Sequence, residues 1–466
     1  MALVLGVCGG CHDHKLLQAQ QSLRAGDVNS AQRDIREYAR HHRDSGNALI
    51  AELERGSIAL AAGDHETSGE AFARADELLR EIDRQPDVSL SREMLAALTN
   101  LSTLPYRGTH YDRVMLSTYR ALGALRQGDT DAARPYLITA YERQREAVAA
   151  NAKRLEAAQS AAAPGTPDRG YDAARAQRDP RLQAALDRQY RPLAGLRAYA
   201  DYVNPFAEWL QGVYFTAEAA DGNDLERARV SFARTVSLVP GSGYVAQDAA
   251  AAERLAAGGA AEPVTYVVLA TGVAPSRGEV RIDIPVFVFG GAVDYVGANF
   301  PRLIYHSNFL RDLTVRVPGE DGGERYTTEL LSDMDSVVSQ EFENELPIIV
   351  TKTLVAAGTK AALAYAIREA VDDQNNDLAT LVRIFSLLYQ YAANQADLRT
   401  WATLPKQFRI ARLPTPPGGT ILLTAPGQPT ATVTLDPVQT NMVFVRSINT
   451  YAPWQAWQFS LGKDIR

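Results

Sequence analysis

The sequence predicts an α-helical first half joined to a mixed α+β second half, and three observations support this fold class. Gly-Asp turns flanked by Ala-rich helical patterns recur in the first half. Alternating apolar and polar residues begin after Pro240, as expected for strands. Charged residues make up 22% and hydrophobic residues 46%, which are globular values. The chain of 466 residues is long enough for several cores.

The repeated turns predict antiparallel helix pairs over residues 12–258. Their glycines should supply the left-handed residue that ends the first helix, while a following Asp caps the second. The unit is similar to the tetratricopeptide (TPR) helix-turn-helix. Successive glycines are 37, 65 and 94 residues apart, whereas regular repeats are about 34 residues long, so the array should be irregular. The turn glycines are Gly26, Gly63, Gly128 and Gly222.

Between the third and fourth turns, residues 142–197 are rich in Ala, Arg and Gln and are interrupted by Pro and Gly. This composition is typical of a long helical segment that leaves the repeat array and has an exposed loop. We interpret the segment as a solvated spacer, and the alternative is contact with a partner protein.

Residues 259–466 predict one α+β domain whose sheet is completed by the C-terminus. Two helices are expected in it, at 330–370 with a break at Pro347, and at 378–401. The expected strands are 264–271, 279–289, 303–305, 313–317, 421–424, 430–435 and 442–448.

The only two cysteines, Cys8 and Cys11, follow a short apolar run at the N-terminus. This pattern indicates a bacterial lipoprotein signal, with residues 1–11 as its remnant. We favour lipidation at Cys11, because the small Gly10 precedes it, over Cys8, which follows the bulky Val7. The signal is short and has no basic residue, so we expect a start codon further upstream. The protein would be lipid-anchored at the periplasmic face of the outer membrane.

The same cysteines allow three other interpretations. With His12 they satisfy the C-x-x-C-H pattern of covalent haem attachment, although only seven residues precede Cys8. Together with His12 and His14 they have the ligand types of a zinc site, but four ligands this close make a poor closed site. They could also be incidental residues of an unstructured start. We therefore expect no cofactor and no metal.

The remaining residues give little sign of catalysis. A net charge of -7 argues against nucleic acid binding. Glu341 and Glu345 share a helix face and are interpreted as a solvated acidic surface. The Gly241-Ser242-Gly243 string lacks the preceding strand of a nucleotide or nucleophile loop. Trp454 and Trp457 predict either a tail packed on the last sheet or an interface anchor. No catalytic residue is predicted.

Three strings of residues carry a family resemblance. They are residues 111–116 (YDRVML), 204–212 (NPFAEWLQG) and 397–405 (DLRTWATLP). With them the chain resembles an uncharacterised family of bacterial envelope lipoproteins that have TPR-like helices. The resemblance implies an accessory role in envelope assembly and provides no catalytic residues.

These observations favour a periplasmic scaffold that binds partner proteins or peptides through its helical repeats, without catalysis. The alternative is an envelope hydrolase that acts on cell-wall material, with Glu341 and Asp335 brought together in the α+β domain. A third interpretation has the apolar segment 346–371 contacting lipid. Its internal charges, such as Lys352 and Lys360, argue against a membrane span.

Overall fold

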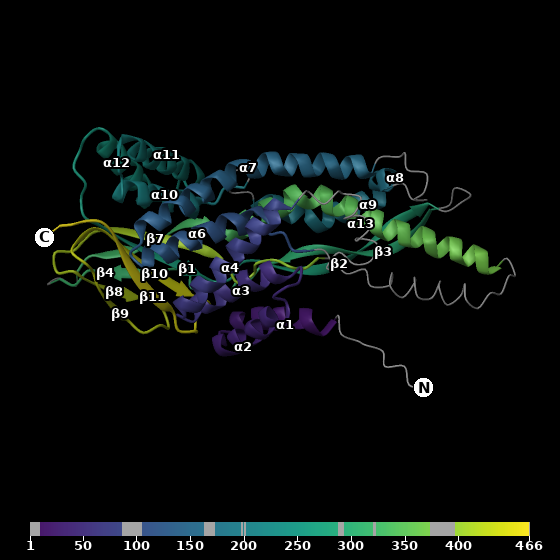
Figure 1. Ribbon diagram of the computed structural model, residues 1–466, viewed down its shortest axis with the longest axis horizontal. Coiled ribbons are helices and arrows are strands. Elements are labelled where there is room, and N and C mark those ends of the chain that lie inside the picture. Colours follow the sequence, from purple (N-terminus) through teal and green to yellow (C-terminus); the bar gives the residue numbers. More distant parts are fainter. Residues whose placement is uncertain are drawn as a thin grey trace.

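The computed structural model describes residues 10–85, 105–162, 173–196, 199, 202–287, 293–319, 323–372 and 397–465. It confirms the mixed class: helices dominate the first half, and a region rich in strands follows (Figure 1).

The helices of the first half form hairpins joined by three-residue turns or slightly longer loops. Gly26, Gly63 and Gly128 all have positive φ angles at these turns. Asp27 and Asp64 then cap the following helices. The paired helices are α1 (Gly10–Arg24) with α2 (Val28–His41), α3 (Ala48–Ala61) with α4 (His65–Arg84), α6 (His110–Arg126) with α7 (Thr130–Ala162), and α10 (Pro205–Ala217) with α11 (Gly222–Leu238).

Gly222 departs from the expected role. It is the first residue of α11 and has no positive φ, while Asp221 supplies the cap. The prediction of a left-handed residue here is wrong because α10 already ends at Ala217, four residues before the cap. Helix α12 (Gly243–Ala256) follows, and Ser242 of the Gly-Ser-Gly string caps its N-terminus.

Small residues let paired helices approach closely, and a ring fills the groove between them. A Cβ on Gly56 would lie 2.4 Å from the ring of Phe72, and one on Gly212 would lie 2.8 Å from the ring of Phe232. Larger residues at these glycines would therefore separate the helices.

The main sheet has the strand order β11-β10-β1-β7-β6, and β1 is parallel to β10. Alternate side chains of β1 enter two cores: Tyr266 and Val268 face the helices, and Val267 and Leu269 face a second sheet. Its strands are β1 (Val264–Thr271), β6 (Glu329–Asp333), β7 (Gln407–Pro414), β10 (Val438–Ser447) and β11 (Gln455–Asp464). The core on its helical side runs continuously from the α1 helix to β11.

The second sheet has the order β5-β4-β8-β9 and packs on the other face of the main sheet. Its strands are β4 (Thr314–Arg316), β5 (Arg325–Thr327), β8 (Thr420–Thr424) and β9 (Ala431–Thr434). The expected strands near the C-terminus are therefore divided between two sheets, because β8 and β9 belong to this sheet and β10 to the main one.

A ribbon of β2 (Ser276–Phe287) and β3 (Val293–Ile304) extends away from both sheets beside α13 (Met334–Asp372) (Figure 1). The short helices α8 (Ala173–Gln177) and α9 (Pro180–Tyr190) and the 3-10 helix η2 (Arg191–Leu196) contribute to the core between them. Because Leu182, Leu186 and Tyr190 are buried there, this part of residues 142–197 is not the solvated spacer we expected.

Two helix predictions need correction. Residues 330–333 lie in β6, and α13 continues through Pro347 without a break. Packing of α13 against α7 and the ribbon outweighs the hydrogen bond that the proline removes. Of the expected helix 378–401, only 397–401 lies in the described part, and it is not helical. Among the described residues, no helix is long and apolar enough to span a membrane.

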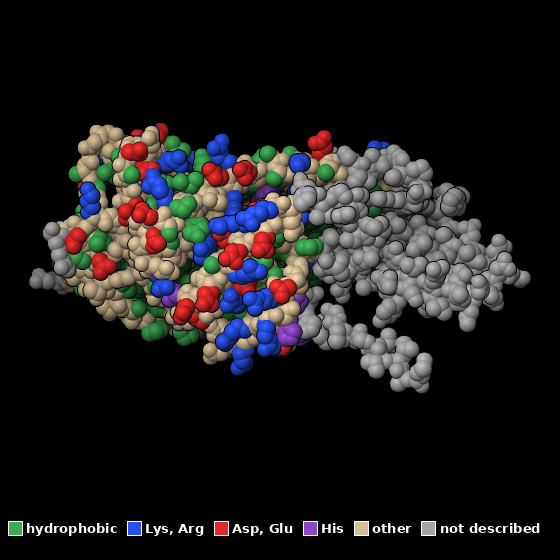
Figure 2. Space-filling model, in the orientation of Figure 1, with side chains coloured by type: hydrophobic (Ala, Val, Ile, Leu, Met, Phe, Trp, Pro, Cys, Tyr) green, Lys and Arg blue, Asp and Glu red, His purple; other side chains and the backbone are tan. Residues whose placement is uncertain are grey.

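Positive and negative side chains are interspersed over the helical face of the molecule (Figure 2).

Candidate functional site

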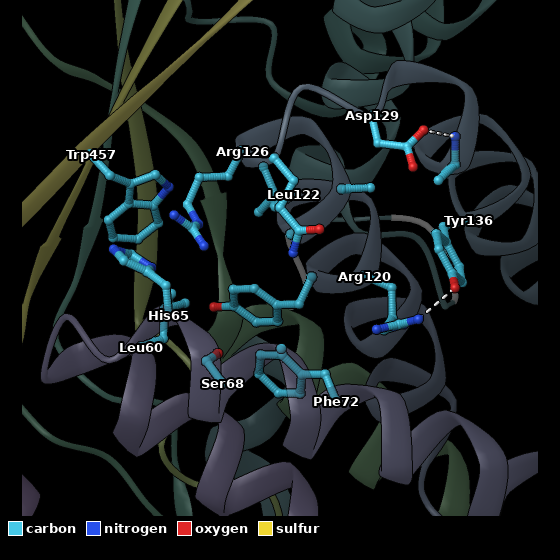
Figure 3. Close-up of a pocket in the computed structure, with 16 residues that line it drawn as sticks. Leu60, His65, Ser68, Phe72, Arg120, Leu122, Arg126, Asp129, Tyr136 and Trp457 are labelled. Carbon is cyan, nitrogen blue, oxygen red and sulfur yellow. Dashed lines mark hydrogen bonds between the residues drawn. The ribbon is translucent and has the colours of Figure 1, made fainter.

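A cavity of about 160 Å³ lies between the helix pair α3–α4 and the helix pair α6–α7, and β11 closes one side of it (Figure 3). Apolar side chains form much of its wall, and they include Leu60, Phe72, Leu122 and Trp457. The volume is about that of one large side chain. The cavity therefore has room for a single anchoring residue of another molecule.

The cavity exists because two glycines face it. Gly69 on α4 and Gly123 on α6 both line it, and a Cβ added at either would meet no atom within 4 Å. Behind them, the Phe72 ring stacks on Tyr119 with centroids 5.2 Å apart. The ring of Trp457 meets His65 edge-on at 5.0 Å (Figure 3). The empty space is thus bounded by fixed rings.

The polar part of the lining is basic. Arg120 donates from Nη2 to the Tyr136 hydroxyl over 2.6 Å, but its Nε is buried without a hydrogen-bond partner among the described residues. Arg126 forms no ion pair within the described part of the chain. Burial, with help from Arg126, lowers the pKa of His65. Asp129 also lines the cavity, but its carboxylate caps α7 at the Ala132 N–H.

The structure places most of the residues singled out in the sequence away from this cavity. Cys8 lies outside the described residues, and Cys11 lies in the first turn of α1, where its side chain is not described. Trp457 does line the cavity, while the partly buried Trp454 packs against the core between the two sheets. None of the four turn residues Gly26, Gly63, Gly128 and Gly222 is in its lining.

Glu341 and Glu345 are buried, with exposed fractions of 2% and 8%, so the prediction of a solvated face is wrong. Glu341 accepts the backbone N–H groups of His110 and Tyr111 at 2.6 and 2.9 Å and so caps α6 from another helix. Glu345 lies 3.0 Å from Arg154 and 3.7 Å from Arg277. These carboxylates join α13 to α6, α7 and β2.

The buried carboxylates of Glu341 and Glu345 differ in their ionisation. Burial and the neighbouring Glu345 charge raise the pKa of Glu341 to about 8. Burial opposes the ionisation of Glu345 as well, but Arg154 and Arg277 lower its pKa. Glu345 therefore carries the negative charge of the pair.

Asp335, the other carboxylate considered for hydrolysis, is paired with Lys406. Burial raises its pKa to about 6 against the effect of that lysine. Neither Asp335 nor Glu341 lines the cavity. Within the described ranges, no group of three His, Cys, Asp or Glu side chains is arranged to hold a metal ion.

Residues 397–406, which include the whole third resemblance string, form a segment between the helices and the sheet. Trp401 is fully buried and donates from Nε1 to the Ser57 hydroxyl over 2.7 Å. The Glu54 carboxylate accepts from the Ala402 N–H, from Gln20 and from the Thr403 hydroxyl. We call these residues the inserted segment.

Glu54 should make stability depend on pH. Burial raises its pKa from 4.5 to about 7, so the folded state binds a proton that the unfolded state releases. Its contribution to stability is complete below pH 4.5 and is lost as the pH rises through 7, by roughly 3 kcal/mol in all. The variant Glu54→Gln mimics the protonated form and should lose less stability between pH 5 and pH 8, measured by urea unfolding.

The exposed Glu66 on α4 offers a matched control. Glu66→Gln should keep the pH profile of the unchanged protein. Parallel profiles for Glu54→Gln and the unchanged protein would contradict the assignment.

No protein-family model, curated protein or solved structure shows significant similarity to the chain.

Sequence reasoning missed most of the residues that line the cavity. Arg120 and Arg126 lie on α6 and His65 lies on α4, and no sequence spacing connects the two helices. The one signal present in the sequence was Gly69 and Gly123, two helical glycines that serve neither as turns nor as close helix contacts.

Proposed function

We propose that the protein is a non-catalytic adaptor that binds a partner protein through the cavity between its second and third helix pairs. The observation that carries this proposal is the position of the cavity, which opens between two successive helix hairpins and is bounded by rings and two arginines. Stacked helical hairpins commonly bind partners in this way. The N-terminal cysteine pattern supports a lipid-anchored location at the periplasmic face of the outer membrane, with a role in envelope assembly.

The lining favours one kind of ligand. An apolar side chain of the partner would occupy the space beside Phe72 and Trp457 and would displace water from it. A carboxylate next to that side chain would pair with Arg126, which forms no ion pair among the described residues. The expected ligand is therefore a peptide segment with a large apolar residue beside an acidic one.

Filling the cavity should abolish binding without unfolding the protein. The variant Gly69→Leu places its side chain in empty space and replaces a helical glycine, so its melting temperature should not fall. Peptides that bind the unchanged protein can be selected from a random display library. Their affinity for Gly69→Leu should be at least about tenfold lower, because the pocket for their anchoring side chain is filled. Fluorescence anisotropy with labelled peptides gives the affinities.

Gly222→Leu is the matched control, because Gly222 also lies on a helix with no atom within 4 Å of an added Cβ, and it lies outside the cavity. It should bind the selected peptides as the unchanged protein does. The proposal fails if no peptide is enriched, or if the enriched peptides bind Gly69→Leu with unchanged affinity.

A further inference from the structure

A second, wider cavity lies between α9 and the β2–β3 ribbon, away from the site described above. It has a volume of about 560 Å³, and its lining includes three arginines: Arg181 and Arg188 on α9 and Arg281 on β2. Asp283 is the only acidic residue among those that line it. The site is thus locally positive in a chain whose net charge is -7.

The three arginines lie outside the ion pairs formed among the described residues. Each is exposed to solvent. Asp179 accepts the N–H groups of Arg181 and Leu182 and the hydroxyl of Tyr295, and the hydrogen bond from Leu182, with help from the Arg181 charge, lowers its pKa. Three like charges around one cavity repel one another, so an anion bound there would relieve that repulsion.

Two features orient the guanidinium groups. The Arg181 guanidinium lies 5.1 Å from the centre of the Tyr295 ring, and the hydrogen bond to Asp179 holds that ring. Arg281 lies across the ribbon at Gly297, where an added Cβ would be 1.9 Å from its Nε. The absence of a side chain at 297 therefore leaves the space that Arg281 occupies.

We propose that this cavity binds a phosphate ester. Planar guanidinium groups match the oxygens of phosphate with paired hydrogen bonds, and a phosphate monoester carries enough charge to meet several arginines at once. The cavity is large enough for the phosphate together with a small organic group. Such an ester could be a soluble metabolite or the headgroup of a lipid.

Titration calorimetry of the full chain with glycerol 3-phosphate, and with glycerol as the neutral control, tests the site. Flotation with vesicles of phosphatidic acid and phosphatidylcholine, compared with phosphatidylcholine alone, tests the lipid source. We expect saturable binding of glycerol 3-phosphate or of the anionic vesicles, and none of either neutral control. Binding only to vesicles identifies a headgroup, and binding only to the soluble ester identifies a metabolite.

Arg188→Gln and Arg281→Gln should each weaken binding by about five- to tenfold, the effect of one solvent-exposed hydrogen bond. Gly297→Ala should weaken it as well by displacing Arg281. Arg325→Gln, at an exposed arginine on β5, should leave it unchanged. Gly69→Leu should also bind the phosphate ester normally, which separates this site from the peptide cavity. The proposal is overturned if neither probe binds, or if Arg188→Gln and Arg281→Gln bind like the unchanged protein.

Discussion

Replacing Trp401 with alanine should destabilise the protein by about 3–5 kcal/mol, the range for removing a large buried aromatic side chain. The indole is fully buried, and its ring centre lies within 6 Å of those of Phe72 and Tyr119. The substitution opens a cavity between two helix pairs and also leaves the Ser57 hydroxyl without its donor. Urea unfolding followed by circular dichroism measures the loss.

Trp454→Ala is the matched control, since it removes the same side chain from a partly buried position. Its cost should be clearly smaller. If both variants lost the same free energy of unfolding, Trp401 in the inserted segment would contribute no more to stability than the partly buried Trp454.

Replacing Arg446 with methionine should also cost about 3–5 kcal/mol, although methionine fills much of the same volume. Arg446 on β10 is 2% exposed and donates to the carbonyl oxygens of Ala270, Gly272, Thr403 and Ser447. Burial lowers its pKa to about 10, so it stays charged at neutral pH. Without the guanidinium, four buried acceptors lose their donor.

Arg325→Met, at an exposed arginine of β5, should change stability by less than about 0.5 kcal/mol. Thermal unfolding of both variants compares them directly. A melting temperature for Arg446→Met equal to that of the unchanged protein would show that the four carbonyls find other donors.

The helix hairpins could be predicted because their signals are local. A left-handed glycine and an Asp cap act within a few residues, and the structure has them at Gly26-Asp27 and Gly63-Asp64. Strand β1 was also evident, since its run of apolar residues is buried on both faces. In such segments the backbone conformation follows from neighbouring residues alone.

Other elements depend on distant partners and left weaker signals. β7 and β11 were not predicted, because their residues take strand conformation by pairing with β1 and β10. The burial of Glu341 follows from the N-terminus of α6, 231 residues away along the chain. A charged residue usually indicates an exposed position, and no residue near Glu341 in the sequence indicates that it caps α6.

The candidate peptide site was only partly predictable for the same reason. The helix pairs indicated a binding surface, and Trp457 was considered as an interface residue. The cavity itself requires β11 to close beside α4, an arrangement that brings His65 and Trp457 together from opposite ends of the chain. Residue spacing carries no information about such a contact.

The inserted segment has a consequence for how the chain reaches its native state. Ser57 and Trp401 are 344 residues apart, and β1 lies between two strands that follow it by more than 130 residues. Closing such long loops is slow, because the contacts that offset the lost chain entropy form only late in folding. During synthesis the early helices therefore expose apolar surfaces until the last quarter of the chain has emerged. A shortened chain that ends before Trp401 would keep those surfaces exposed and should aggregate or be degraded.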